Sequence, residues 1–279
     1  MSDQKKYSSI HYTSYLQLEK ILDAQSPRSK ELGKEAHEET LFIIVHQVYE
    51  LWFKQVLHEM ESVMKLFQTN NVDEKNIDIA VSRLERVNEI VKLMIQQVRV
   101  IETMTPLDFL DFRSYLFPAS GFQSFQFRKL EVMLGLKKEK RTSYTAYPYY
   151  HEFSQEQQDE ILRLEASPSL FVLLESWLER TPFIDIQGFD FKSKYMQAVS
   201  NMLNRERQAI ETSDYLSDQE KAMRLKMNGD TDTYFANIFN AAFHEQHIAE
   251  GKMRLSFKAT MAALLIQLYG TEPLLQLPY

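Results

Sequence analysis

The chain has 279 residues, of which 44% are hydrophobic and 25% are charged, with a formal net charge of −7 and no cysteine. The lack of cysteine excludes disulfides, thiolate metal sites and cysteine nucleophiles. The acidic balance disfavours a nucleic-acid partner, because such partners bind to basic patches. Residues 1–6 lack the apolar core of a signal peptide, and no apolar run is long enough for a membrane span. We therefore expect a cytoplasmic protein that crosses no membrane.

Only seven glycines interrupt the chain, which predicts long helices with few tight turns. We expect an all-α, long-helix bundle that forms a single domain over residues 1–279. Within it, residues 137–160 and 186–232 are predicted to be peripheral loop and helix regions. The first expected helix covers Ile10–Leu22, where apolar residues keep a roughly helical spacing.

The stretch Leu41–Met64 contains neither glycine nor proline and predicts a long helix. Over residues 41–53 its apolar side chains cover nearly the whole circumference, which is typical of a buried helix. Phe42, His46 and Glu50 recur every four residues and share one face. A buried imidazole needs a hydrogen-bond partner or a function. His46 is therefore either a core histidine bonded to a neighbouring side chain or a site residue.

A second long helix is expected over Ile77–Glu102, with apolar spacing typical of packing. After it, Thr105 is a suitable N-cap, Pro106 suits the first helical position, and Asp108 stands where a capping box has its acidic residue. This short helix must end before Pro118.

Phe109 and Arg113 are four residues apart and share a face of that short helix. Arg113 lies among aromatic residues, so it either pairs with Asp108 or Asp111 or serves a binding site. A further helix is expected to open at Ser120 and Gly121 and to close at Gly135.

The rest of the chain predicts helices over 170–178, 191–210, 232–250 and 257–269, with a polar loop at 228–233. His244 and His247 could meet a metal from one helix face, but no third ligand is evident nearby. Since acidic residues flank them, we interpret both as surface residues. The apolar end, residues 264–279, suggests that further protein covers it.

Two long stretches carry a resemblance to a known family. The first is FIIVHQ followed by YELWFKQ, within residues 42–55, and the second contains TMTPLDF, FR and PASGFQS, within residues 103–124. Both resemble the tryptophan 2,3-dioxygenase family, and weaker similarity extends over residues 12–16, 177–182 and 254–273. The likeness covers nearly the whole chain.

The resemblance implies a cytoplasmic, all-α, homotetrameric enzyme that contains haem b and therefore iron. Such an enzyme inserts both atoms of dioxygen into L-tryptophan and forms N-formylkynurenine, the first step of tryptophan catabolism by the kynurenine pathway. The residues at the family's functional positions are His46, facing the indole N–H as the catalytic residue; Phe42 and Phe109, lining the indole pocket; Arg113, pairing with the substrate carboxylate; Ser120 and Gly121, at the haem; and Tyr12, Tyr15 and Leu16, reaching into a neighbouring subunit's pocket.

In that family the axial histidine of the haem iron follows a Trp-Arg-Tyr pattern, which implies a position beyond Tyr279. We therefore expect no metal ligand among the seven histidines of this chain, and we expect the dioxygenation to require a further C-terminal polypeptide. The alternative is a non-catalytic fragment or pseudoenzyme of the family, a helical protein that oligomerises or binds indole without haem. The downstream reading frame distinguishes the two.

Overall fold

Helices account for all regular structure in the described part of the chain. The computed structural model describes residues 9–69, 72, 74–138, 141, 148–180 and 190–268, and none of these lies in a β-strand. The all-α prediction is therefore confirmed. The contacts divide the chain into two compact units, residues 1–170 and 171–279, and each is described by itself.

The N-terminal helix of the first unit is shorter than predicted. In place of one helix over residues 10–22, α1 (Tyr12–Leu16) and α2 (Leu18–Leu22) are separated by Gln17, whose φ is +52°. The Nε2 of Gln17 donates a hydrogen bond to the carbonyl of Ser14 at 2.6 Å. This local bond helps to hold Gln17 in the left-handed conformation that ends the first helix.

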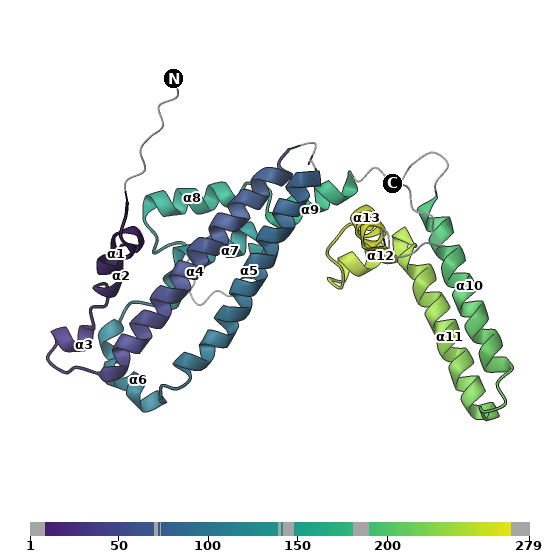
Figure 1. The fold of residues 1–279 in the computed structure, drawn as a ribbon, viewed down its shortest axis with the longest axis horizontal. Coiled ribbons are helices and arrows are strands. Elements are labelled where there is room, and N and C mark those ends of the chain that lie inside the picture. The colour runs from purple at the N-terminus through teal and green to yellow at the C-terminus, as the bar shows by residue number, and fades with distance from the viewer. Residues whose placement is uncertain are drawn as a thin grey trace, which may run out of the picture. The chain divides into compact units, whose positions relative to one another are not determined.

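Helix α3 (Arg28–Glu31) leads into α4 (His37–Phe67), which pairs lengthwise with α5 (Glu74–Ile101), as Figure 1 shows. Both long helices were predicted, and each starts a few residues earlier than expected. Met60 and Val63 are fully buried. The buried carboxylate of Glu59 accepts a hydrogen bond from Arg86 at 2.7 Å and thereby ties the two helices together.

The prediction that α4 is buried on all sides is wrong. Ile44 and Leu51 are 42% and 52% exposed. In the first unit α4 packs against α5, α6 and α7, and these helices cover only part of its circumference. The remaining apolar face is open in a single chain.

The capping box predicted at Thr105 is confirmed. Helix α6 (Pro106–Arg113) begins with Thr105 accepting from the backbone N–H of Asp108, and the Asp108 side chain accepts from that of Thr105. The short helix η1 (Ser114–Leu116) follows. The helix expected from Ser120 to Gly135 is two elements, η2 (Gly121–Gln123) and α7 (Phe125–Met133), because Ser124 caps α7 separately. Helix α7 packs between α4 and α8 (Gln155–Glu165).

The second unit contains α9 (Leu170–Glu179), α10 (Phe191–Glu211), α11 (Asp218–Ile238), α12 (Ala241–Ala249) and α13 (Phe257–Leu268). Helices α10 and α11 form a hairpin (Figure 1). A core is formed by Phe191, Phe239, Met261 and Leu265, which come from α10, α13 and the end of α11.

The predicted loop at 228–233 and the predicted helix at 232–250 are wrong. Helix α11 runs through the polar segment, and a new helix starts where Asn240 caps α12. Asn228 is buried, and its Nδ2 donates to the carbonyl of Leu203 at 3.1 Å and to the carboxylate of Glu206 at 3.0 Å. Contacts with α10 therefore stabilise a helix that local propensity disfavours.

In the described residues no helix is long and apolar enough to span a membrane. Of the apolar end predicted over residues 264–279, residues 269–279 lie outside the described part. The peripheral regions assigned to 137–160 and 186–232 stay predictions.

Candidate functional site

A pocket of about 970 Å³ opens on the first unit. Its walls come from α4 between Phe42 and Phe53, from α6 and η1, from residues 119–124, and from Phe127 on α7. Most of the lining is aromatic or otherwise apolar. Among the few charged or titratable side chains are His46, Glu50 and Arg113. The pocket therefore combines a large apolar surface with a small number of polar groups, as ligand sites commonly do.

The imidazole of His46 is oriented by its own helix. Its Nδ1 lies 2.7 Å from the carbonyl oxygen of Phe42, and the two ring centroids are 4.1 Å apart. A carbonyl oxygen can only accept, so Nδ1 carries the proton, and the Nε2 of the neutral ring is left as an acceptor. The side chain is exposed to the pocket. A core histidine bonded to a neighbouring side chain is therefore not what the structure shows.

Arg113 comes from the last turn of α6 and lines the same pocket. Its guanidinium carbon lies 5.8 Å from the ring centroid of Phe109. Neither Asp108 nor Asp111 forms an ion pair with it within the described residues. Instead, Asp108 bonds with Thr105 through its side chain and backbone, and these hydrogen bonds lower the pKa of Asp108. The charge of Arg113 is thus available to an anionic ligand.

His46 and Arg113 share one pocket, but the burial expected for His46 on its apolar helix is wrong. Both side chains are exposed in the single chain, because the pocket is open on one side. The buried residue is Phe112, which packs behind the pocket. Phe112 is fully buried, and its ring lies 5.5 Å from that of Phe42 and 5.4 Å from that of Phe109. These rings hold α6 against α4.

The other end of the pocket has a second aromatic wall. The ring of Phe53 lies 5.5 Å from Phe127 and 6.1 Å from Tyr49, and Phe122 lines the pocket beside them. The hydroxyl of Tyr49 donates to the carbonyl of Met94 at 2.6 Å, which ties this wall to α5. Flat aromatic surfaces of this kind suit a flat ligand.

The sequence did not single out Glu50 and Gln47 as site residues, although both line the pocket. The Nε2 of Gln126 donates to the Glu50 carboxylate at 2.8 Å and to its backbone carbonyl at 2.9 Å. Gln47 donates to the carbonyl of Ala24 at 2.9 Å and accepts from Gln25 at 2.7 Å. The four-residue spacing of Phe42, His46 and Glu50 could have identified Glu50.

Ser120 and Gly121 stand at the rim of the pocket. The Ser120 hydroxyl accepts from the backbone N–H of Phe122, and the Ser120 N–H donates to the Gln123 side chain. A side chain added at Gly121 would meet nothing within 4 Å, so this rim is open. The remaining expected site residues, Tyr12, Tyr15 and Leu16, are exposed on α1 and do not line this pocket in the single chain.

The described residues contain no group of three or more histidine, cysteine, aspartate or glutamate side chains that could hold a metal ion. The interpretation of His244 as a surface residue is wrong. It is 2% exposed, and its Nε2 lies 2.8 Å from the carbonyl oxygen of Leu255, in the connection between α12 and α13. His247 is half-buried, with its Nδ1 2.9 Å from the carbonyl oxygen of Phe243.

The fold and the pocket define a class: an all-α protein with an open pocket lined mainly by aromatic and other apolar side chains, together with an imidazole and a guanidinium. The chain belongs to the tryptophan 2,3-dioxygenase family, whose model matches residues 2–279.

Relatives in bacteria and in a eukaryote support this assignment. The chain is 48% identical to the tryptophan 2,3-dioxygenase of Bdellovibrio bacteriovorus, over 98% of the chain and 76% of the relative. It is 45% identical to that of Alteromonas mediterranea, over 99% and 76%. It is 39% identical to the tryptophan 2,3-dioxygenase of Dictyostelium discoideum, over 99% of the chain and 69% of the relative.

Proposed function

We propose that this chain is an oxidoreductase that binds L-tryptophan in the pocket of the first unit and converts it, with dioxygen, to N-formylkynurenine. The observation that carries the proposal is a single aromatic pocket that contains both a hydrogen-bond-accepting imidazole and a guanidinium without a carboxylate partner within the described residues. The relatives that it matches are named tryptophan 2,3-dioxygenases.

Each polar group suits one part of the substrate. The planar guanidinium of Arg113 can bind the amino-acid carboxylate with two parallel hydrogen bonds. The Nε2 of His46 can accept the hydrogen bond of the indole N–H. Phe42 and Phe109, whose ring centroids are 5.8 Å apart, offer apolar area to the indole ring. Together these groups would fix both ends of the substrate.

We propose haem b as the cofactor, and the aromatic lining of the pocket supports this proposal because flat rings suit a flat macrocycle. The aromatic wall of Phe53, Phe122 and Phe127 would face the macrocycle, and the open rim at Ser120 and Gly121 would border it. When bound, haem would supply the activation of dioxygen. Among the described residues His46 is the histidine that lines the pocket, and we assign it to the substrate side, so we assign no described histidine as the iron ligand.

We further propose a cytoplasmic homotetramer in which Tyr12, Tyr15 and Leu16 enter a neighbouring subunit's pocket. Their exposure on α1 and the open apolar face of α4 at Ile44 and Leu51 support this assembly. The lack of cysteine suits a reducing compartment. Light scattering at micromolar concentration should give a tetramer mass, and a monomer mass would contradict the assembly.

The decisive experiment supplies the haemin-loaded protein, expressed from its complete reading frame, with L-tryptophan and isotopically labelled dioxygen. Mass spectrometry should find both labelled oxygen atoms in N-formylkynurenine. Product that carries one label would contradict a dioxygenase. Tryptophan binding without a haem absorption band and without product would support a non-catalytic member of the family instead.

A further inference from the structure

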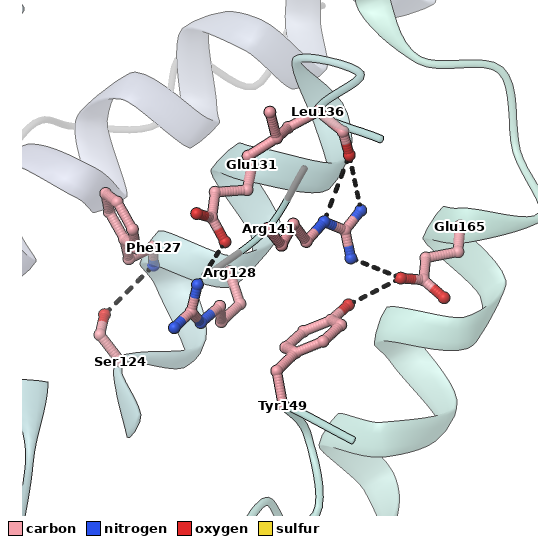
Figure 2. Close-up of polar contacts among 8 residues, drawn as sticks. All are labelled: Ser124, Phe127, Arg128, Glu131, Leu136, Arg141, Tyr149 and Glu165. Carbon is pink, nitrogen blue, oxygen red and sulfur yellow. Dashed lines mark hydrogen bonds and ion pairs between the residues drawn. The ribbon is translucent and has the colours of Figure 1, made fainter. Parts of the chain in front are cut away.

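Arg128 is a buried cation directly behind the aromatic wall of the pocket. It lies on α7, is 4% exposed, and pairs through its Nη1 with the carboxylate of Glu131 at 2.6 Å (Figure 2). Its Nε is also buried and has no hydrogen-bond acceptor in the described part of the chain. No sequence pattern singled Arg128 out, and Arg128 does not line the pocket.

The guanidinium of Arg128 contacts three aromatic rings. Its central carbon lies 5.8 Å from the ring centroids of Phe122 and Phe127 and 5.7 Å from that of Tyr149. Phe122 and Phe127 line the pocket, whereas Tyr149 does not. A guanidinium at this distance attracts the electron-rich face of a ring, and the attraction is stronger where water is excluded. Arg128 thus joins two wall residues to a tyrosine behind the wall.

That tyrosine is itself anchored. The hydroxyl of Tyr149 donates to the carboxylate of Glu165 at 2.8 Å, and Arg141 donates to the same oxygen at 2.5 Å (Figure 2). Arg141 also donates to the carbonyl of Leu136, after the end of α7, at 3.0 and 3.2 Å. Burial and the bond to Glu165 raise the pKa of Tyr149, so its hydroxyl remains a donor at neutral pH. Arg128 therefore holds the wall against a fixed support.

Stability by itself does not explain a charge at this position. A buried ion pair is often no more stabilising than apolar side chains of similar size, and a buried N–H without an acceptor costs free energy. The adjacent Lys129 shows the contrast. Its ammonium contacts two carboxylates, at 2.6 Å in Glu160 and 3.6 Å in Glu61, and it lies 5.8 Å from the ring centroid of Phe125, which does not line the pocket.

We propose that Arg128 is a positioning residue that holds Phe122 and Phe127 in place and so sets the shape of the aromatic wall that faces the flat ligand. The identity of that ligand rests on the proposed function, whereas the order of the wall does not. The test therefore needs one measurement on the ligand-free protein and one with haemin as the probe.

The test compares variants of the full-length protein. Arg128→Met removes the cation. Arg128→Met combined with Glu131→Met removes both charges, so that no carboxylate is left unpaired if the single variant folds poorly. Arg128→Lys keeps the charge but not the planar group that stacks on rings. Lys129→Met is the matched control, because it removes an ion-paired cation from the same helix without touching the pocket wall.

In the ligand-free protein, both Arg128→Met variants should speed amide hydrogen exchange in residues 120–127 by about tenfold, since two wall contacts of cation–π strength are lost. Arg128→Lys should restore the thermal stability that Arg128→Met loses, but amide hydrogen exchange in residues 120–127 should stay as fast as in Arg128→Met. Lys129→Met should leave exchange in this segment at the wild-type rate. Haemin affinity should fall by about tenfold in the Arg128 variants and stay unchanged in the control.

Exchange in residues 120–127 that is the same in the double variant and in Lys129→Met would overturn the positioning role. So would full recovery of both readouts by Arg128→Lys, because charge alone would then suffice. If the wild-type protein takes up no haemin, the proposed cofactor fails. The exchange rates still decide whether Arg128 orders the wall.

Discussion

The same short pattern, phenylalanine followed four residues later by histidine, occurs in α4 and in α12. Phe42 and His46 have ring centroids 4.1 Å apart at an interplanar angle of 36°, and Phe243 and His247 have centroids 4.1 Å apart at 37°. In both pairs the imidazole Nδ1 bonds to the carbonyl oxygen of the phenylalanine, at 2.7 and 2.9 Å. Helical spacing alone therefore sets the ring contact and the tautomer.

The surroundings of the two histidines differ. His46 faces a pocket that also contains Arg113 from α6 and the aromatic ring of Phe127 from α7. His247 is half-buried beside the turn after α12, where its own carbonyl accepts from the backbone N–H groups of Lys252 and Met253. A histidine with a free acceptor nitrogen becomes a candidate site residue only where other elements add complementary groups.

The largest expected effect comes from Arg113, which α6 contributes to the pocket that contains His46. Arg113→Ala should weaken tryptophan binding by about 2–5 kcal/mol, because a charge-assisted pair is lost and the ligand carboxylate is left unpaired. Arg254→Ala is the control, since Arg254 lies over the ring of Phe171 at 4.3 Å in the second unit. Titration calorimetry should find no change for the control. Equal losses in both variants would contradict the assignment of Arg113.

The pocket that contains His46 also depends on the pairing of α4 with α5. Burial alone would raise the pKa of Glu59, but hydrogen bonds and charge interactions, chiefly with Arg86, outweigh it and lower the pKa below its ordinary value of 4.5. A lowered pKa means that the stabilisation is present above the unfolded-state pKa and is lost as the pH falls through the folded-state pKa. The first unit should therefore lose stability on acidification below about pH 4.5.

Trp52 lies on α4 and Trp177 on α9, so in a Trp177→Phe background the fluorescence of Trp52 reports on the first unit. Urea unfolding should show that Glu59→Gln costs about 1.5–3 kcal/mol at neutral pH, the usual contribution of a hydrogen bond to a charged group. In the variant, the free energy of unfolding should also decrease less between neutral and acidic pH. A wild-type acid profile retained by Glu59→Gln would assign that loss to other carboxylates.

The two histidines provide the most direct comparison. His46→Ala should weaken tryptophan binding by about 0.5–1.5 kcal/mol, the net contribution of one hydrogen bond. His247→Ala removes an imidazole in the same local geometry and should leave binding unchanged. Calorimetry on both variants tests this, and a similar loss in each would show that the surroundings of His46 do not distinguish it.

The smallest expected effect concerns the stacked rings. Phe42→Leu should weaken tryptophan binding by about 0.5–1.5 kcal/mol or less, since a branched aliphatic side chain keeps part of the apolar contact. Phe243→Leu should reduce only the stability of the second unit. A loss of binding in Phe243→Leu would contradict the view that the α12 pair is structural.

Local patterns in the sequence were sufficient wherever the interacting groups lie within one or two helical turns. The capping box of Thr105 and Asp108 and the stacking partners of His46 and Arg113 involve neighbours three or four residues away. Such contacts form in any helix with that spacing. The sequence therefore determined the helical class, the long helices of the first unit, and the two polar groups that line the pocket.

The tertiary structure decided which groups from distant elements come into contact. Asn228 lies within a helix because α10 accepts its hydrogen bonds, and His244 is buried because the carbonyl of Leu255 folds back to it. Arg128 stands behind the pocket wall because α7 packs between α4 and α8, and the pocket is open because too few elements cover α4. Each outcome depends on groups more than ten residues apart, whose meeting is set by packing and by the need to satisfy buried polar atoms.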